Sequence, residues 1–219
     1  MSGGFQGAYA DSGEAYLSHV CFVKGIRCWA DEAKFGGIVI QPQPDPVSAK
    51  INSWHVSVAA ESIVASLFAR IGYDVSVQYG ANQPEYDLSI SQGDRMAKVS
   101  VKGSQDGSWG LTQKYLKGLT KADYHGAIEK WEAAHSHKTL FALVQFKGVS
   151  LHELPRVYLA APTEIAERLR ATSKGKGDTI LHENKVWTSK AHGAGTIDAV
   201  PDSWRFTQAR VEQLLSNLQ

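Results

Sequence analysis

Two stretches near the middle of the chain alternate between apolar and polar residues, which is the pattern of a half-buried β-strand. They are residues 85–90 and 98–102, and residues 91–94 between them supply the Ser, Gly and Asp that favour a tight turn. The apolar positions of the two stretches are Leu88, Ile90, Val99 and Val101. The pattern therefore predicts a β-hairpin that places Asp87 of one strand beside Lys102 of the other, with both side chains facing the same way.

A stripe of apolar residues at spacings of three and four precedes the hairpin and predicts a helix that begins near Ser53. Ser53 is a suitable N-cap residue, and Gly72 suits the position just after the last turn. The stripe consists of Val56, Ala59, Ala60, Ile63, Val64, Leu67, Phe68 and Ile71. Glu61 lies within this helix, and a predicted strand at residues 73–79 joins the helix to the hairpin.

The rest of the chain adds both helices and strands. Residues 121–134 have a helical pattern, and residues 139–146 form a nearly continuous apolar run, which is typical of a strand covered on both faces. The further elements that we expect are a strand at 156–160, a helix at 163–171, a strand pair within 179–188 and a closing helix at 204–218. This order of elements predicts an α/β domain with a mixed central sheet flanked by helices.

The first 50 residues differ in composition from the remainder of the chain. They are rich in glycine and end in the Pro-rich segment 41–46, which resembles a polyproline linker. We therefore expect an N-terminal extension with a linker over residues 1–50 and one compact domain over residues 51–219.

Composition narrows the classes of function. The formal net charge is +1, so any nucleic-acid binding must come from local patches rather than from bulk charge. No apolar run approaches the roughly 18 residues of a membrane helix, and the first residues lack the pattern of a signal peptide. Cys21 and Cys28 are too few for a zinc site, and two reduced thiols are favoured over a disulfide. These features predict a cytoplasmic protein without a membrane partner, and they leave a homodimer open.

The chemistry of the hairpin points to phosphate esters. Two carboxylates can hold Mg²⁺, with Mn²⁺ as a substitute, and a neighbouring ammonium group can orient water or stabilise a charged transition state. Asp87 and Lys102 are the candidate groups, Glu61 is the candidate second acid, and the backbone carbonyl of Val101 is a further candidate ligand. The sequence thus predicts a metal-dependent site for phosphodiester hydrolysis.

The same residues resemble the PD-(D/E)xK nuclease superfamily over residues 53–161. Members carry a Glu on the first core helix, an Asp at the second strand and an acid-x-Lys on the third, which Glu61, Asp87 and Lys102 match. The resemblance implies a restriction-endonuclease-like core of order α-β-β-β-α-β. It also implies a Mg²⁺-dependent DNA endonuclease of repair, restriction or phage-related defence.

Ser100 departs from the family pattern, because it stands where the motif has its second acid. Some restriction enzymes of the superfamily also carry Ser-x-Lys and recruit an acid from a neighbouring helix. Glu61 is the first candidate for that acid, followed by Glu129 and Glu132. The alternative is a catalytically degenerate module on the same fold that binds nucleic acid or protein without cleaving.

Basic residues accompany the hairpin. Between Arg95 and Lys121 there are six Lys or Arg and a single acid, Asp106, so this segment is a candidate track for the DNA backbone. A second basic run extends from Arg168 to Lys190. The candidate nucleic-acid-binding residues are Arg95, Lys98, Lys114, Lys117 and Lys121, with Trp109 as a ring on which a base could stack.

Overall fold

The computed structural model describes residues 51–78, 86–116 and 122–218. The predicted N-terminal extension over residues 1–50 lies outside these ranges, and so do Lys117 and Lys121. In chain order the elements are α1 (Ser53–Arg70), β1 (Asp74–Val77), β2 (Leu88–Gln92), β3 (Arg95–Ser104), β4 (Ser108–Gly110), η1 (Gln113–Leu116), α2 (Tyr124–Ala133), β5 (Thr139–Gln145), β6 (Arg156–Ala160), α3 (Pro162–Gly175), β7 (Ile180–His182), β8 (Asn184–Val186), β9 (Ile197–Ala199), η2 (Asp202–Trp204) and α4 (Gln208–Ser216).

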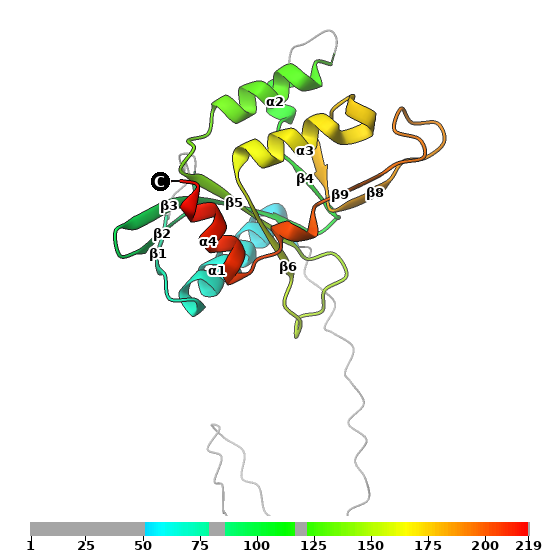
Figure 1. Cartoon of the computed structure of the whole chain (residues 1–219). Coiled ribbons are helices and arrows are strands. Elements are labelled where there is room, and N and C mark those ends of the chain that lie inside the picture. Colours follow the sequence, from blue (N-terminus) through cyan, green and yellow to red (C-terminus); the bar gives the residue numbers. More distant parts are fainter. Residues whose placement is uncertain (1–50, 79–85, 117–121, 219) are drawn as a thin grey trace, which may run out of the picture. The chain divides into compact units, whose positions relative to one another are not determined.

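The central sheet has five strands in the order β1-β2-β3-β5-β6. Strands β1, β2 and β3 are antiparallel neighbours, β5 runs parallel to β3, and β6 is antiparallel to β5. The prediction of an α/β domain with a mixed sheet flanked by helices is therefore confirmed (Figure 1). None of the helices within the described ranges is long and apolar enough to cross a membrane.

Each face of the sheet has its own apolar core. Helices α1 and α4 cover one face, and α2 and α3 cover the other (Figure 1). Every residue of β5 is buried, as its continuous apolar run predicts, because alternate side chains enter the two cores. The first core includes Ala60, Val64, Phe68, Val211 and Leu214, and the second includes Ile128, Trp131, Ile165 and Leu169.

Helix α1 lies unusually close to β3 at Gly103. A Cβ atom on this residue would lie 2.9 Å from both Cγ1 and the carbonyl oxygen of Val56 and 3.0 Å from Cβ of Ala60. Such distances are below van der Waals contact, so only glycine allows the backbones to approach in this way. The contact fixes the distance between α1 and the end of β3.

Several predicted boundaries are wrong in detail. The N-cap of α1 is Asn52 rather than Ser53, because the Asn52 Oδ1 accepts the His55 N–H at 3.1 Å. Two strands lie within 179–188, as predicted, but they do not pair with each other: β7 pairs with β4, and β8 pairs with β9.

Candidate active site

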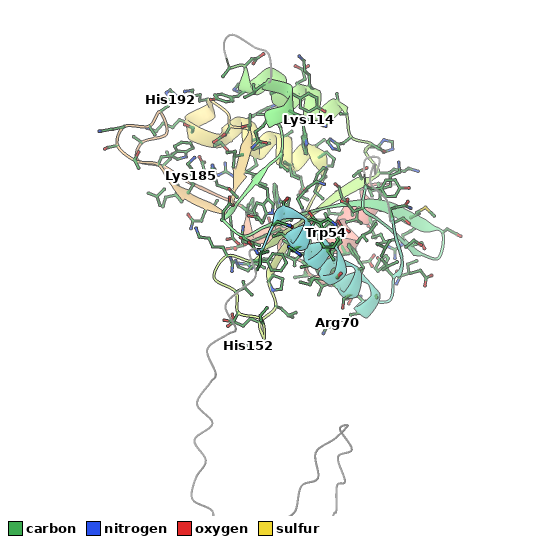
Figure 2. The ribbon with its side chains drawn as sticks, turned by 180° about the vertical axis from the view of Figure 1, so that it is seen from behind. Trp54, Arg70, Lys114, His152, Lys185 and His192 are labelled. Atoms are coloured by element: carbon green, nitrogen blue, oxygen red, sulfur yellow. The ribbon has the colours of Figure 1, made fainter. Side chains whose placement is uncertain are left out.

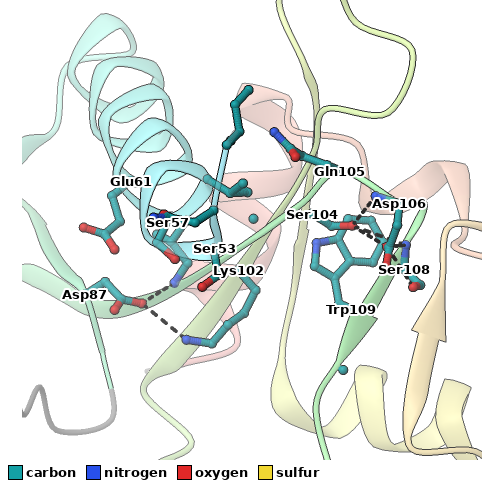
Figure 3. A pocket seen from close by; sticks show the side chains of 16 residues that line it. Ser53, Ser57, Glu61, Asp87, Lys102, Ser104, Gln105, Asp106, Ser108 and Trp109 are labelled. Carbon is teal, nitrogen blue, oxygen red and sulfur yellow. Dashed lines mark hydrogen bonds and ion pairs between the residues drawn. The ribbon is translucent and has the colours of Figure 1, made fainter. Parts of the chain in front are cut away.

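A cleft beside the predicted residues lies between the first turns of α1 and the end of β3. It has a volume of about 510 Å³ and opens to solvent. Figure 3 shows the side chains that line it. Glu61, Asp87, Val101 and Lys102 all line it. The structure therefore brings together four of the five residues for which the sequence predicts catalysis or metal binding. The fifth, Ser100, is buried and does not line the cleft.

Asp87 stands where the β2–β3 ladder ends. Its N–H donates to the Val99 carbonyl at 2.9 Å, and Leu88 is then the first residue of β2. Continuing the register from Leu88 opposite Val99 places Asp87 opposite Ser100. Because side chains alternate along a strand, the side chains of Asp87, Ser100 and Lys102 share one face.

The Asp87 carboxylate is held by three groups of β3. Its Oδ2 accepts the Val101 N–H at 2.6 Å and the Ser100 hydroxyl at 3.4 Å. The Lys102 ammonium lies 3.7 Å from the same oxygen (Figure 3). Ser100 is 2% exposed, whereas the Lys102 side chain is 42% exposed. Lys102 is thus the most exposed member of this group, and the Asp87 side chain is 18% exposed.

Glu61 approaches the same carboxylate from α1. Partial burial raises the pKa of Glu61, and the negative charge of Asp87 raises it further. The positive charge of Lys102 acts in the opposite direction on the pKa. The two acids are therefore close enough to repel each other, and this repulsion makes ionisation of Glu61 more costly.

The backbone of Val101 faces the same edge. In a strand the N–H and C=O of one residue point to the same side. Since the Val101 N–H donates to Asp87, the Val101 carbonyl is directed to the same side of β3 as β2, beyond the point where the β2–β3 pairing stops. This orientation agrees with the expected role of the carbonyl as a ligand.

Two carboxylates and a backbone carbonyl suit Mg²⁺, which keeps several of its waters and takes few protein ligands. Within residues 51–78, 86–116 and 122–218, no three His, Cys, Asp or Glu side chains are grouped so that they could hold a metal ion. Glu132 forms an ion pair with Arg170 at 2.6 Å, and neither Glu129 nor Glu132 lines the cleft. Among the candidates for a second acid, Glu61 alone is a cleft residue.

The predicted DNA track is only partly assembled. Arg95 pairs with Glu212 and lies seven residues from Lys102, which is roughly 23 Å along a strand. Trp109 is 3% exposed and donates its indole N–H to the Val144 carbonyl, so its predicted stacking on a base is wrong. Lys98 and Lys114 lie over the rings of Tyr86 and Tyr115.

The far wall of the cleft contains residues that sequence reasoning missed. Asp106 Oδ1 accepts both the hydroxyl and the N–H of Ser108 at 2.9 Å, and the hydroxyl of Ser104 at the same distance. Burial acts to raise the pKa of Asp106, but these hydrogen bonds outweigh it and lower the pKa. The buried Gln145 donates to the Ser104 hydroxyl and so ties this wall to β5. The Ser-x-Asp-x-Ser spacing at residues 104–108 is a local signal for such a turn.

Other cleft residues come from α1 and from the turn after β3: Ser53, Ser57 and Gln105. A comparison with known protein families finds none that matches this chain, and a comparison with curated proteins finds no relative.

Proposed function

We propose that this chain is a divalent-metal-dependent endonuclease that hydrolyses phosphodiester bonds in DNA. The observation that carries the proposal is the Asp87–Lys102 pair, 3.7 Å apart in an open cleft that also contains Glu61. Carboxylates serve to hold a divalent cation, and an accessible ammonium group serves to neutralise a phosphate or orient water. The opposite charges therefore fit a phosphodiester substrate.

The order of the elements supports the proposal. Helix α1, the antiparallel strands β1 to β3, helix α2 and the parallel strand β5 succeed one another as in a restriction-endonuclease-like core, with β4 and η1 inserted before α2. We therefore propose this fold for the domain.

Mg²⁺ is the proposed cation, and Mn²⁺ would replace it. Asp87, Glu61 and the Val101 carbonyl would hold it. The fit rests on the donor set, since two carboxylates line one cleft and the Val101 carbonyl is directed to the same edge. When bound, the cation withdraws charge from the phosphate and makes an attacking water more acidic.

The residues of β3 divide the remaining tasks. Lys102 would orient the attacking water and donate to a phosphate oxygen, because its ammonium group is exposed to the cleft. The Val101 N–H and the Ser100 hydroxyl fix Asp87 Oδ2. Ser100 is neutral, so it positions the acid but does not replace the charge of the missing carboxylate.

The test is incubation of the protein with supercoiled, linear and branched DNA in Mg²⁺, Mn²⁺ or EDTA. We expect cleavage with either cation, none in EDTA and none with Asp87→Ala or Lys102→Ala. Asp94→Ala and Lys138→Ala are matched controls, because both residues are exposed and outside the cleft. A wild-type protein that is inert with every DNA and cation would overturn the proposal.

A non-cleaving binding module is the second candidate, because Ser100 leaves the motif with one acid fewer. Cleavage that appears only in Ser100→Asp would establish this second reading.

A further inference from the structure

A β-hairpin formed by β8 and β9 exposes an apolar pair. Strands β8 and β9 pair only with each other, and Val186 lies opposite Ile197. The two side chains are 70% and 64% exposed. The hairpin extends beyond α3 (Figure 1), and Lys185 and His192 mark its position in the opposite view (Figure 2).

The base of the hairpin is firmly anchored by one buried acid. Asp198 accepts the Trp187 indole N–H, and it accepts the Ser173 N–H and an Arg168 N–H at 2.9 Å each. Arg168 also donates to the Ala199 carbonyl at 2.9 Å. The hairpin and the end of α3 are therefore held as one surface, which we call the hairpin surface and define as residues 173–177 and 184–199.

The α3 part of this surface has a strained backbone. Ser173 and Lys174 have φ of 56° and 57°, the left-handed region that residues with a Cβ rarely adopt. The hydrogen bonds from the Ser173 N–H to Asp198 and from the Gly177 N–H to the Thr172 carbonyl maintain the turn. The turn leaves Lys174 exposed. Non-glycine residues in this conformation persist where the surroundings impose it, often for a functional reason.

The exposed charges of the hairpin surface are all positive. Its single acid, Asp198, is 8% exposed and already accepts three hydrogen bonds. Its basic residues are Lys174, Lys176, Lys185 and Lys190, and of these only Lys185 is partly buried, over the Trp187 ring. An exposed cationic surface around a small apolar pair matches a polyanion that also has apolar edges, which is the character of a nucleic acid.

The hairpin surface continues from the wall of the cleft. Ser108 of β4 lines the cleft and pairs with His182 of β7, and β8 begins two residues later at Asn184. Strand β7 therefore connects the wall of the cleft to the start of the hairpin.

We propose that the hairpin surface is an accessory nucleic-acid contact, in which its exposed lysines bind backbone phosphates and the Val186–Ile197 pair packs against the sugars. This inference rests on the proposed function and extends it from the cleft to the path of the substrate. It assigns a role to lysines that the candidate track at residues 95–121 does not include.

The test measures binding of the full chain to a short labelled DNA duplex in EDTA by fluorescence anisotropy at several KCl concentrations. The test variant is Lys174→Gln/Lys176→Gln/Lys190→Gln. The control variant is Arg70→Gln/Lys130→Gln/Lys138→Gln, which removes the same charge from exposed residues elsewhere; Arg70 lies at the far end of α1 (Figure 2).

We expect the test variant to lose about tenfold or more in affinity, with the salt slope reduced by roughly 2 to 3, since each phosphate contact contributes about 0.9 to the slope. The control variant should keep the wild-type slope. Val186→Ser/Ile197→Ser should weaken binding without changing the slope, because apolar contacts release no counterions. Lys174→Gly should raise the Tm, because glycine adopts this φ without strain, and it should weaken binding, because the ammonium group is lost. A turn with only a structural role would show the first change without the second.

Equal losses in the test and control variants would overturn the inference, since they would reflect bulk charge. Wild-type binding in the test variant, or absence of binding in the wild type, would overturn it as well. Cleavage by the wild type in Mg²⁺ is measured in parallel. If the wild type cleaves while these binding results fail, the inference about the hairpin surface is wrong and the proposed function still holds.

Discussion

The two ends of β3 each place a carboxylate beside a cation, but they do so in different ways. At the start of the strand, Glu212 lies 2.5 Å from Arg95 and accepts the Tyr73 hydroxyl at 2.9 Å. The hydrogen bond from Arg95, followed by that from Tyr73, lowers the pKa of Glu212. At the other end, Asp87 is 3.7 Å from Lys102, and its charge helps to raise the pKa of Glu61.

The difference separates a structural ion pair from a candidate site. The hydrogen bonds to Glu212 favour its ionised form, so the charge at this end of β3 is already balanced without a bound ion. In the cleft, two acids lie close to one lysine, and burial together with the charge of Asp87 opposes ionisation of Glu61. A divalent cation and a phosphate would balance the charges of the cleft residues. The Arg95–Glu212 end of β3 offers no reason to bind either.

The largest effect should come from exchanging one acid at each end. Asp87→Asn keeps an oxygen for the Val101 N–H but removes the charge, and we expect cleavage to fall by about 10³-fold or more. Glu212→Gln should leave cleavage close to wild type and lower the Tm slightly, because it weakens the bond from Arg95. Rates on supercoiled DNA and thermal melts of both variants measure the contrast. Similar losses of cleavage in both would show that the two ends do not differ in function.

The second largest effect should come from moving α1, the helix that positions Glu61 at the cleft. Gly103→Ala places a methyl group 2.9 Å from the Val56 carbonyl oxygen, and we expect a loss of about 1–3 kcal/mol in the free energy of unfolding. The accompanying shift of α1 should also slow cleavage. Chemical denaturation measures the first effect. Val56→Ala removes the contact with Cγ1 but not that with the carbonyl, so the double variant should recover only part of the loss. A fully stable Gly103→Ala would show that the close approach is not rigid.

Much of this arrangement can be derived from local pattern. The alternation at 85–90 and 98–102, with a turn between them, is sufficient to predict that Asp87 and Lys102 lie on one face, because strand register determines side-chain direction. The buried strand β5 can be predicted equally well, since a continuous apolar run is typical of a strand that is buried on both faces.

The pairing of charges across the fold could not be predicted from the sequence. Arg95 and Glu212 are 117 residues apart, and Arg170 and Glu132 are 38 apart. Such contacts depend on how whole helices pack, so the sequence does not show which residues of a basic run are neutralised by a distant acid, as Arg95 is by Glu212. The same reason explains Trp109, whose burial depends on the short pairing of β4 with β7.

A smaller effect should result from returning an acid to the motif. Ser100→Asp adds a negative charge beside Asp87, and aspartate fits this buried position better than glutamate does. We expect the affinity for Mg²⁺ to rise by about tenfold, or about 1.4 kcal/mol of binding free energy, and the Tm without metal to fall. Calorimetric titration with Mg²⁺ measures the first change. Ser100→Ala is the control, because it removes the hydroxyl without adding charge. Unchanged affinity in Ser100→Asp would mean that position 100 does not face the cation.

The smallest effect is the pH dependence that Glu61 gives to stability. The pKa of Glu61 is raised in the folded protein, so the folded state keeps this proton to a higher pH than the unfolded state does. As the pH rises from the ordinary range of a glutamate through the raised pKa, the wild type should therefore lose stability that Glu61→Gln does not lose. The two proteins should melt alike in acid, and Glu61→Gln should be the more stable at neutral pH, by less than about 1 kcal/mol for a partly exposed charge.

Added Mg²⁺ should reverse the order, because a cation that binds only the folded wild type raises its stability. Thermal melts across pH, with and without Mg²⁺, test both statements. A variant that responds to Mg²⁺ as strongly as the wild type would show that Glu61 is not a ligand, and the cleft would then have Asp87 as its only acid at the cation.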